Sequence, residues 1–324
     1  MKILPATEEN IRKAAEIIRE GGVVAFPTET VYGLGADALN PKAVSRIFEI
    51  KNRPHFDPLI VHVCSIEMAK DIAYIDEISL RLMERFWPGP LTLVLPKKDK
   101  VPPITTAGLD TVAVRMPAKH TALKLIEYSS TPISAPSANP FGYVSPTRAE
   151  QVYEMLGEKV DLILDGGKTD FGVESTIIMV REDGVFLLRP GALPVEEVED
   201  LLKVKVNEFK GDKTLAPGML PRHYSPKAKV KIMSEWEDYF KLKAIYPKTI
   251  LVLSKKNPYY DQRAIFLSED GDHREIARNL FDILYSLDKM GIEFAIFQGV
   301  EEKGLGRAIM NRLKKASGEI IREI

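Results

Sequence analysis

The chain has 324 residues, of which 45% are hydrophobic and 28% charged, and its formal net charge is -1. The length exceeds the usual range of one domain, so we expect two, and the near-zero charge excludes a strong overall attraction to nucleic acid or anionic membrane while leaving room for a local basic cleft. The single cysteine, Cys64, excludes an internal disulfide and a multi-cysteine metal site. Together with the lack of a signal peptide or a long apolar run, it favours a cytoplasmic protein without membrane attachment.

The first elements alternate between helix and strand. Apolar residues recur at helical spacing from Ile11 to Ile18, after Thr7, which can cap the helix. The pair at 21–22, two glycines, ends this helix, and the run VVAF follows as a buried strand. Asn40 and the proline after it predict the start of a second helix.

Short runs rich in branched apolar residues predict more strands, separated by helices or by Pro/Gly turns. These runs are LIVHV, LTLVL, TVAVRM, PISA and DLILD, and STIIMV with VFLLR predicts a hairpin across EDG. Because strands and helices do not alternate strictly, we expect an α/β fold with a twisted mixed sheet and helices packed on it.

The character of the chain changes near residue 203. Residues 203–229 contain three prolines and no sustained period, which predicts a linker between a first domain at 1–202 and a second at 230–324. Beyond the linker, VKIM, TILVL, RAIFL and FAIFQ predict strands, and a helix is expected over 275–290. This pattern is typical of a small parallel α/β domain of Rossmann-like type.

Polar clusters at strand ends are the candidates for chemistry, although each has an ordinary interpretation. PTET, with Thr30, is equally typical of a helix-entry turn. Lys51 and Arg53 in KNRPHFDP are also consistent with solvated surface charge. His62 lies in LIVHV, where period-2 alternation makes it face opposite to its neighbours, and a lone histidine there is more often structural than catalytic.

Further polar residues add weight to a binding site. Arg115 lies in a predicted central strand, where its burial is costly unless it pairs with an anion. Thr147 and Glu150 predict a capping box that leaves the Ser145 hydroxyl uncommitted. Other polar residues lie in turns or at a strand end, namely Ser137, Asn139, Ser175 and Arg189. Together these residues favour the binding of a polyphosphate and a small zwitterion.

Several other chemistries lack their sequence signatures. The chain has no G-x-x-x-x-G-K-[ST] loop, no dinucleotide fingerprint after a first strand and no G-x-S-x-G elbow. It also lacks H-E-x-x-H and clustered carboxylates, so we expect no resident metal site. Any Mg²⁺ would then arrive with the nucleotide, held mostly by its phosphates.

Ten ordered motifs carry a resemblance to a known family. AFPTETVYGLG, KNRP with DPLIVH, WPGPLTLVL, AGLDTVAVRMP, APSAN, SPT, DGG, GVESTI, LLRPG, and APGM with HYSP resemble the threonylcarbamoyl-AMP synthase family in its two-domain form. The resemblance implies a YrdC-like catalytic domain over about the first 200 residues. It also implies a nucleotidyltransferase that makes threonylcarbamoyl-AMP and pyrophosphate from L-threonine, bicarbonate or CO2, and ATP. The product would pass to a tRNA threonylcarbamoyl transferase complex; the resemblance leaves direct tRNA binding open.

The resemblance also implies two groups of ligand-binding residues and no side chain with an acid or base role. The group implied for L-threonine is Thr30, His62, Arg115, Ala135 and Ser175. The group implied for ATP is Lys51, Arg53, Asp57, Thr111, Ser137, Ser145, Arg189 and Tyr224. Because Tyr224 lies in the linker, the linker would act as a lid that closes the site against water.

Two points stay open at the level of the sequence. Asp57 stands where most members of the family have Asn, and a carboxylate accepts hydrogen bonds but repels phosphate, so its role is uncertain. The alternative function is a non-catalytic RNA-binding module whose concave surface carries Lys51, Arg53, Arg115 and Arg189. Near-zero net charge and the lack of aromatic stacking motifs disfavour this alternative.

Overall fold

The structure is a computed structural model that describes residues 2–211, 214–220, 223–233, 236–256 and 264–318. It divides into two compact units. The first comprises Met1–Phe141, Ser145–Asp170 and Glu174–Met219, and the second comprises Gly142–Val144, Phe171–Val173 and Leu220–Ile324. The predicted linker 203–229 is therefore shared between the units, with its part up to Met219 in the first unit.

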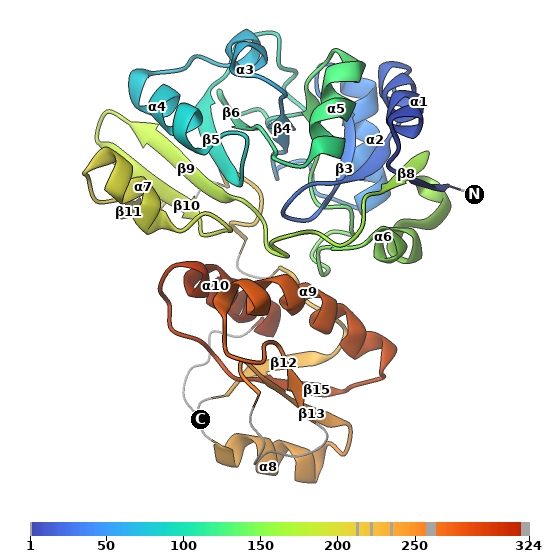
Figure 1. The fold of residues 1–324 in the computed structure, drawn as a ribbon, viewed down its shortest axis with the longest axis vertical. Helices are drawn as coiled ribbons and strands as arrows, with labels where there is room; N and C mark the ends of the chain where they lie inside the picture. The colour runs from blue at the N-terminus through green and yellow to red at the C-terminus, as the bar shows by residue number, and fades with distance from the viewer. Residues whose placement is uncertain (1, 212–213, 221–222, 234–235, 257–263, 319–324) are drawn as a thin grey trace. The chain divides into compact units, whose positions relative to one another are not determined.

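The described strands of the first unit form one mixed sheet of eleven strands, in the order β1-β8-β2-β3-β7-β4-β6-β5-β9-β10-β11. Figure 1 shows this unit, with helices packed around its strands. They are β1 (Ile3–Pro5), β2 (Val24–Pro27), β3 (Tyr32–Asp37), β4 (Ile60–His62), β5 (Leu91–Pro96), β6 (Thr111–Arg115), β7 (Ile133–Ser134), β8 (Leu162–Asp165), β9 (Thr176–Arg181), β10 (Gly184–Arg189) and β11 (Asn207–Glu208). The predicted mixed sheet is confirmed, as is the hairpin, in which Gly184 of β10 pairs with Arg181 of β9.

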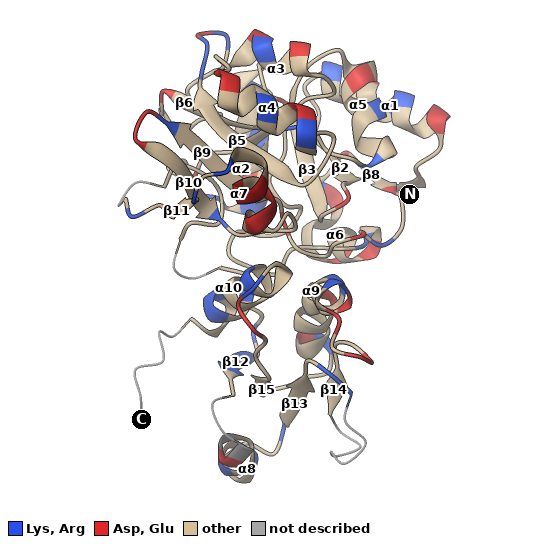
Figure 2. Ribbon diagram, turned by 60° about the vertical axis from the view of Figure 1, so that its left-hand side comes forward, with Lys and Arg blue, Asp and Glu red and all other residues tan. Residues whose placement is uncertain are grey.

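The helices of the first unit lie between these strands in the sequence. They are α1 (Glu8–Arg19), α2 (Pro41–Lys51), α3 (Ile66–Ile72), α4 (Glu77–Phe86), α5 (His120–Ser129), α6 (Ala149–Leu156), the 3₁₀ helix η1 (Gly157–Lys159) and α7 (Val195–Leu202). Both predicted caps are confirmed, because Thr7 Oγ1 accepts the Asn10 N–H and Asn40 Oδ1 accepts the Lys42 N–H. Figure 2 shows charged residues along the outer helices of this unit, such as α4 and α7, while the strands are mostly uncharged.

Helices cover both faces of the sheet around β8, β2 and β3. On one face, Phe26 of β2 packs in a hydrophobic cluster with residues of α1 and α5. On the other face, Ala25 packs in a cluster with residues of α2 and α6. The alternation of side chains along β2 thus accounts for its fully apolar sequence, because each face meets a helix layer.

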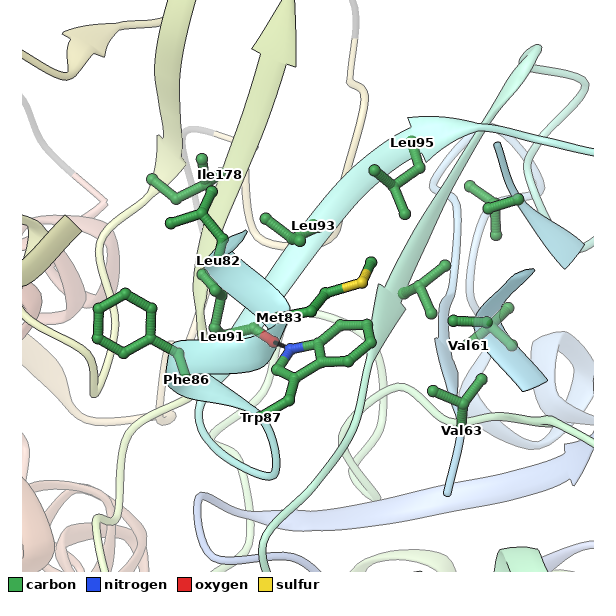
Figure 3. Packing of buried hydrophobic residues seen from close by; sticks show 14 of the residues in the cluster. Val61, Val63, Leu82, Met83, Phe86, Trp87, Leu91, Leu93, Leu95 and Ile178 are labelled. Carbon is green, nitrogen blue, oxygen red and sulfur yellow. Dashed lines mark hydrogen bonds between the residues drawn. The ribbon is translucent and has the colours of Figure 1, made fainter. Parts of the chain in front are cut away.

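The largest cluster lies under the strands β4, β6, β5 and β9. Leu93, Val114 and Ile178 pack there with residues of α3, α4 and α7, together with Trp87 (Figure 3). The indole Nε1–H of Trp87 donates a hydrogen bond of 2.8 Å to the Leu91 carbonyl, so its polar atom is satisfied inside the cluster.

The opposite face of these four strands is covered by loop residues. A smaller cluster there contains Ile60, Val94, Ala113 and Met179, against which Ala216 of the segment after β11 packs. One face of the sheet is thus covered by loops. A polar site can form between such loops and the rigid sheet.

The second unit contains a four-stranded parallel sheet in the order β12-β15-β13-β14. Its strands are β12 (Lys229–Ile232), β13 (Thr249–Leu253), β14 (Ile265–Phe266) and β15 (Phe294–Phe297), and its helices are α8 (Trp236–Ile245), α9 (His273–Lys289) and α10 (Leu305–Ser317). The predicted small parallel α/β domain is confirmed, and the helix expected over 275–290 is α9.

Truncation of Leu93 should destabilise the first unit. Its side chain is fully buried in a central strand, so Leu93→Ala leaves a cavity and should lower the free energy of unfolding by about 2–5 kcal/mol. Urea unfolding followed by the fluorescence of Trp87, with Trp236 changed to Phe in every variant, measures this unit. Ile78→Ala on α4, where the isoleucine is 39% exposed, is the matched control and should change stability by less than about 1 kcal/mol. Equal losses in the two variants would contradict the proposed packing.

Candidate active site

Three polar side chains lie side by side across the sheet face that the loops cover. Arg115 of β6 is in register with Thr92 of β5 on one side and with His62 of β4 on the other. Residues in register on adjacent strands point to the same face, so these side chains form one row. All three are buried. The sequence predicted His62 and Arg115 as site residues. It did not predict Thr92, because this threonine lies within the apolar run LTLVL.

Arg115 forms a buried ion pair with Glu29. The guanidinium Nη2 lies 2.6 Å from Glu29 Oε1, and the exposed fractions of the two side chains are only 4% and 5%. Glu29 Oε2 accepts the Ala118 N–H at 3.0 Å. Within the described residues, the Nε of Arg115 is buried and has no hydrogen-bond partner. Arg115 thus pairs with an anion of the protein itself, as its burial requires, and its Nε–H remains for a ligand.

Thr30 lies in the turn between β2 and β3, next to Glu29. The hydroxyl of Thr28 donates to the Val31 carbonyl at 2.7 Å and lies 2.8 Å from the hydroxyl of Thr30. Because the one hydroxyl proton of Thr28 is used for Val31, Thr30 donates to Thr28, and its own oxygen stays available as an acceptor. The interpretation of PTET as a helix-entry turn is wrong, because this turn joins two antiparallel strands.

His62 is held in its neutral form. Burial, and to a smaller extent the nearby positive charge of Arg115, lower its pKa to about 3. Its ring makes an edge contact with Phe26, with ring centroids 6.3 Å apart. The Nδ1 atom is buried without a hydrogen-bond partner in the described part of the chain. A neutral imidazole in this position can accept a hydrogen bond from a ligand amine but cannot supply a proton at neutral pH.

Ser175 and Arg189 extend the row beyond Thr92. Ser175 Oγ lies 2.8 Å from Thr92 Oγ1 and accepts a hydrogen bond of 3.1 Å from Arg189 Nη2. Arg189 also donates to the Ser175 carbonyl, and through Nη1 to the Pro217 carbonyl at 3.1 Å. A Cβ at Gly191 would lie 2.2 Å from the carbonyl carbon of Ser175, so only glycine lets these loops approach this closely.

The KNRPHFDP segment folds on itself at the end of α2. Arg53 Nη2 lies 2.9 Å from Asp57 Oδ2, and Arg53 Nε donates to the Asp57 carbonyl at 3.1 Å. Lys51 Nζ donates to the backbone carbonyls of Ser137 and Asn139. Burial holds the pKa of Lys51 well below its usual value, and the charge of Arg53 contributes in the same direction. The interpretation of Lys51 and Arg53 as surface charges is wrong, since they are 1% and 6% exposed.

Ser145 does not have the uncommitted hydroxyl that the sequence predicted. Its Oγ donates to Glu174 Oε1 at 2.7 Å, and both residues are buried. The predicted capping box is also wrong, because α6 begins at Ala149 after Arg148. The N–H of Thr147 donates instead to the Gln151 side chain at 2.8 Å, one residue beyond the expected partner Glu150.

The remaining predicted residues fall in different places. Thr111 begins β6 on the same face as Arg115, with its Oγ1 buried and without a hydrogen-bond partner among the described residues. Ala135 follows β7 and donates its N–H to the Ile60 carbonyl at 2.9 Å. Tyr224 belongs to the second unit, where its ring lies 5.3 Å from that of Phe281. Its contact with a ligand of the first unit therefore stays a prediction.

The described residues include neither a metal-binding cluster of side chains nor a membrane-spanning helix. No group of three or more His, Cys, Asp or Glu side chains in the described ranges is arranged to hold a metal ion. Every helix within these ranges is too short or too polar to cross a lipid bilayer.

The fold and this row of side chains define an α/β protein that can bind a small ligand with anionic and amine groups at a sheet face. Models of known protein families match both halves of the chain. The model described as "Telomere recombination", of the Sua5, YciO and YrdC proteins, matches residues 16–191. The model described as "Threonylcarbamoyl-AMP synthase, C-terminal domain" matches residues 193–318.

Curated relatives and solved structures resemble nearly the whole chain. The threonylcarbamoyl-AMP synthase of Pyrococcus abyssi is 49% identical over 325 residues, which cover 96% of this chain and 95% of the relative. That of Bacillus subtilis is 42% identical and covers 97% and 95%. The crystal structure of P. abyssi Sua5 complexed with L-threonine matches with a TM-score of 0.89 and 47% identity, covering 98% and 96% of the two chains.

The chain therefore belongs to the two-domain threonylcarbamoyl-AMP synthase family, and it is an enzyme of the nucleotidyltransferase type. Burial of Lys51, Arg53, Arg115 and Arg189 disfavours the RNA-binding alternative, which places these cations on an open concave surface.

Replacement of His62 by Gln should flatten the pH dependence of stability in acid. An unfolded histidine takes up a proton near pH 6.5, whereas folded His62 does so only near pH 3. Lowering the pH from about 6.5 towards 3 thus favours the unfolded state, by at most about 1.4 kcal/mol per pH unit. Urea unfolding of wild type and His62→Gln at pH 4 to 7, followed by Trp87 fluorescence, measures the difference. His120→Gln, at an exposed histidine, should keep the wild-type dependence. Parallel curves for wild type and His62→Gln would contradict the buried neutral state.

Proposed function

We propose that the enzyme makes threonylcarbamoyl-AMP and pyrophosphate from L-threonine, bicarbonate or CO2, and ATP. The observation that carries the proposal is the buried row of Thr92, Arg115 and His62 in a chain 49% identical to a threonylcarbamoyl-AMP synthase. The relative whose structure holds L-threonine supports threonine as the amino acid.

The row supplies complementary groups for the two ends of threonine. The Nε–H of Arg115 is a charged donor for the carboxylate, and His62 Nδ1 is an acceptor for the amine. Thr30 and Ser175 add small hydroxyl groups, and the backbone at Ala135 borders the row. Because the imidazole is neutral, it does not repel the ammonium form of the substrate.

The reaction consists of two bond-forming steps. The neutral amine of threonine attacks CO2 and loses a proton to solvent, which gives a carbamate. A carbamate oxygen then attacks the α-phosphorus of ATP, and the bond to the bridging oxygen breaks as pyrophosphate leaves. The protein contributes mainly by positioning the reactants and neutralising charge, since the nucleophile is made from substrate.

The ATP side of the site consists of the second group of residues. In our proposal these are Lys51, Arg53, Asp57, Thr111, Ser137, Ser145, Arg189 and Tyr224. Mg²⁺ would bind as part of the nucleotide, with phosphate oxygens and water as its ligands. The segment up to Met219, whose Pro217 carbonyl binds Arg189, would form part of a lid over the site.

The product is a mixed anhydride that reacts readily with water. We propose that it passes to a tRNA threonylcarbamoyl transferase complex, which uses it to modify the adenosine next to the anticodon.

Pyrophosphate release should require all three substrates. The full-length enzyme with ATP and Mg²⁺ should release pyrophosphate only when both L-threonine and bicarbonate are present, and Arg115→Ala should raise the KM for threonine by about 100-fold or more. A coupled pyrophosphate assay with single omissions measures this. Release without threonine, or salt-dependent tRNA binding without turnover, would contradict the proposal.

Replacement of Asp57 by Asn should tighten ATP binding. The change removes a negative charge that is paired with Arg53, so the arginine becomes available to a phosphate, and the KM for ATP should fall by about 3- to 10-fold. Asp71→Asn on α3, at an exposed aspartate, is the control and should leave the KM unchanged. Complete loss of activity in a variant that still unfolds cooperatively would show that the carboxylate has a role of its own.

A further inference from the structure

Glu29 is a buried carboxylate that the proposed reaction does not use directly. It is 3% exposed, and each of its carboxylate oxygens accepts one hydrogen bond, from Arg115 and from the backbone of Ala118. Its backbone carbonyl accepts the Asp170 N–H at 3.0 Å. Three segments distant in the sequence therefore meet here, namely the turn of Glu29, residues 115–118 and Asp170.

The turn that carries Glu29 is rigid. The hydroxyl of Thr28 accepts the N–H groups of Thr30 and Val31, both at 3.2 Å, and the strands on either side pair from Pro27 to Tyr32. Because both the side chain and the backbone of Glu29 are fixed, the ion pair holds Arg115 in one orientation rather than following its motion.

The ion pair also compensates the buried charge of Arg115. A buried guanidinium without a partner costs several kcal/mol, and Arg115 has no other carboxylate partner among the ion pairs of the described residues. With Glu29 in place the charge is balanced, and the unpaired Nε–H remains on the guanidinium for a substrate carboxylate. The contact between Glu29 and Ala118 keeps Glu29 from following a departing guanidinium.

We propose that Glu29 is a positioning residue, which orients Arg115 to bind the carboxylate of the amino-acid substrate. This inference rests on the proposed function, because it assumes that Arg115 binds threonine. Glu29 acts through Arg115 and does not contact the reacting atoms.

The test is a double-mutant cycle in the full-length enzyme. Glu29→Gln keeps the size of the side chain, but an amide has one acceptor oxygen where two N–H donors point, so one of the two contacts is lost. We expect the KM for threonine to rise about 10- to 100-fold, as for loss of one hydrogen bond to a charged group, with the KM for ATP within about twofold of wild type.

The second arm places the change on an Arg115→Ala background. If Glu29 acts only through Arg115, adding Glu29→Gln there should change the KM for threonine by less than about twofold. Glu9→Gln, which removes the partner of Lys13 on the exposed face of α1, is the matched control and should behave as wild type. If Glu29→Gln does not fold, Glu29→Asp, which keeps the charge one methylene shorter, should raise the same KM by a smaller factor.

Each outcome decides between the proposals. An unchanged KM for threonine in a folded Glu29 variant, an equal rise in the KM for ATP, or an additive double mutant would overturn the positioning role. Failure of the wild-type enzyme to bind L-threonine in calorimetry, or to release pyrophosphate with it, would overturn the proposed function instead.

Discussion

The site depends on cationic side chains that are buried and must each be compensated. Transfer of a charge out of water costs several kcal/mol after relaxation, so a sheet face can hold such groups only where anions or carbonyls meet them. Four cations are involved, namely Lys51, Arg53, Arg115 and Arg189. Lys51 and Arg189 donate to backbone carbonyls, whereas Arg53 and Arg115 pair with carboxylates.

The need to compensate each buried cation constrains the sequences of the loops over the site. A carbonyl group compensates a cation only if its loop is held close to the sheet. The Ser175 carbonyl reaches Arg189 because Gly191 leaves room for that approach, and the loop at Ser137 places its carbonyl against Lys51. Loop residues that suggest ligand binding in the sequence thus also build the framework that keeps the cations in place.

Local features of the fold could be predicted from the sequence, whereas the pairing of side chains across the fold could not. The cap at Thr7 and the hairpin of β9 and β10 depend on neighbouring residues, and both are confirmed. The capping box at Thr147 is wrong because Gln151 competes for the same N–H. Nothing near Glu29 in the sequence indicates its pairing with Arg115. Thr92 was missed because it lies in an apolar strand, which can still turn one polar side chain to the site.

The charge balance of the site bears on how it can recognise ligands. His62 is neutral, the pKa of Lys51 is lowered, and the ion pairs of Arg53 and Arg115 cancel their own charges. The residues paired in this way exert little attraction at long range, so the selectivity they confer depends on hydrogen bonds made at short range. A triphosphate beside Lys51 would oppose the lowering of its pKa, because a nearby negative charge favours the ammonium form.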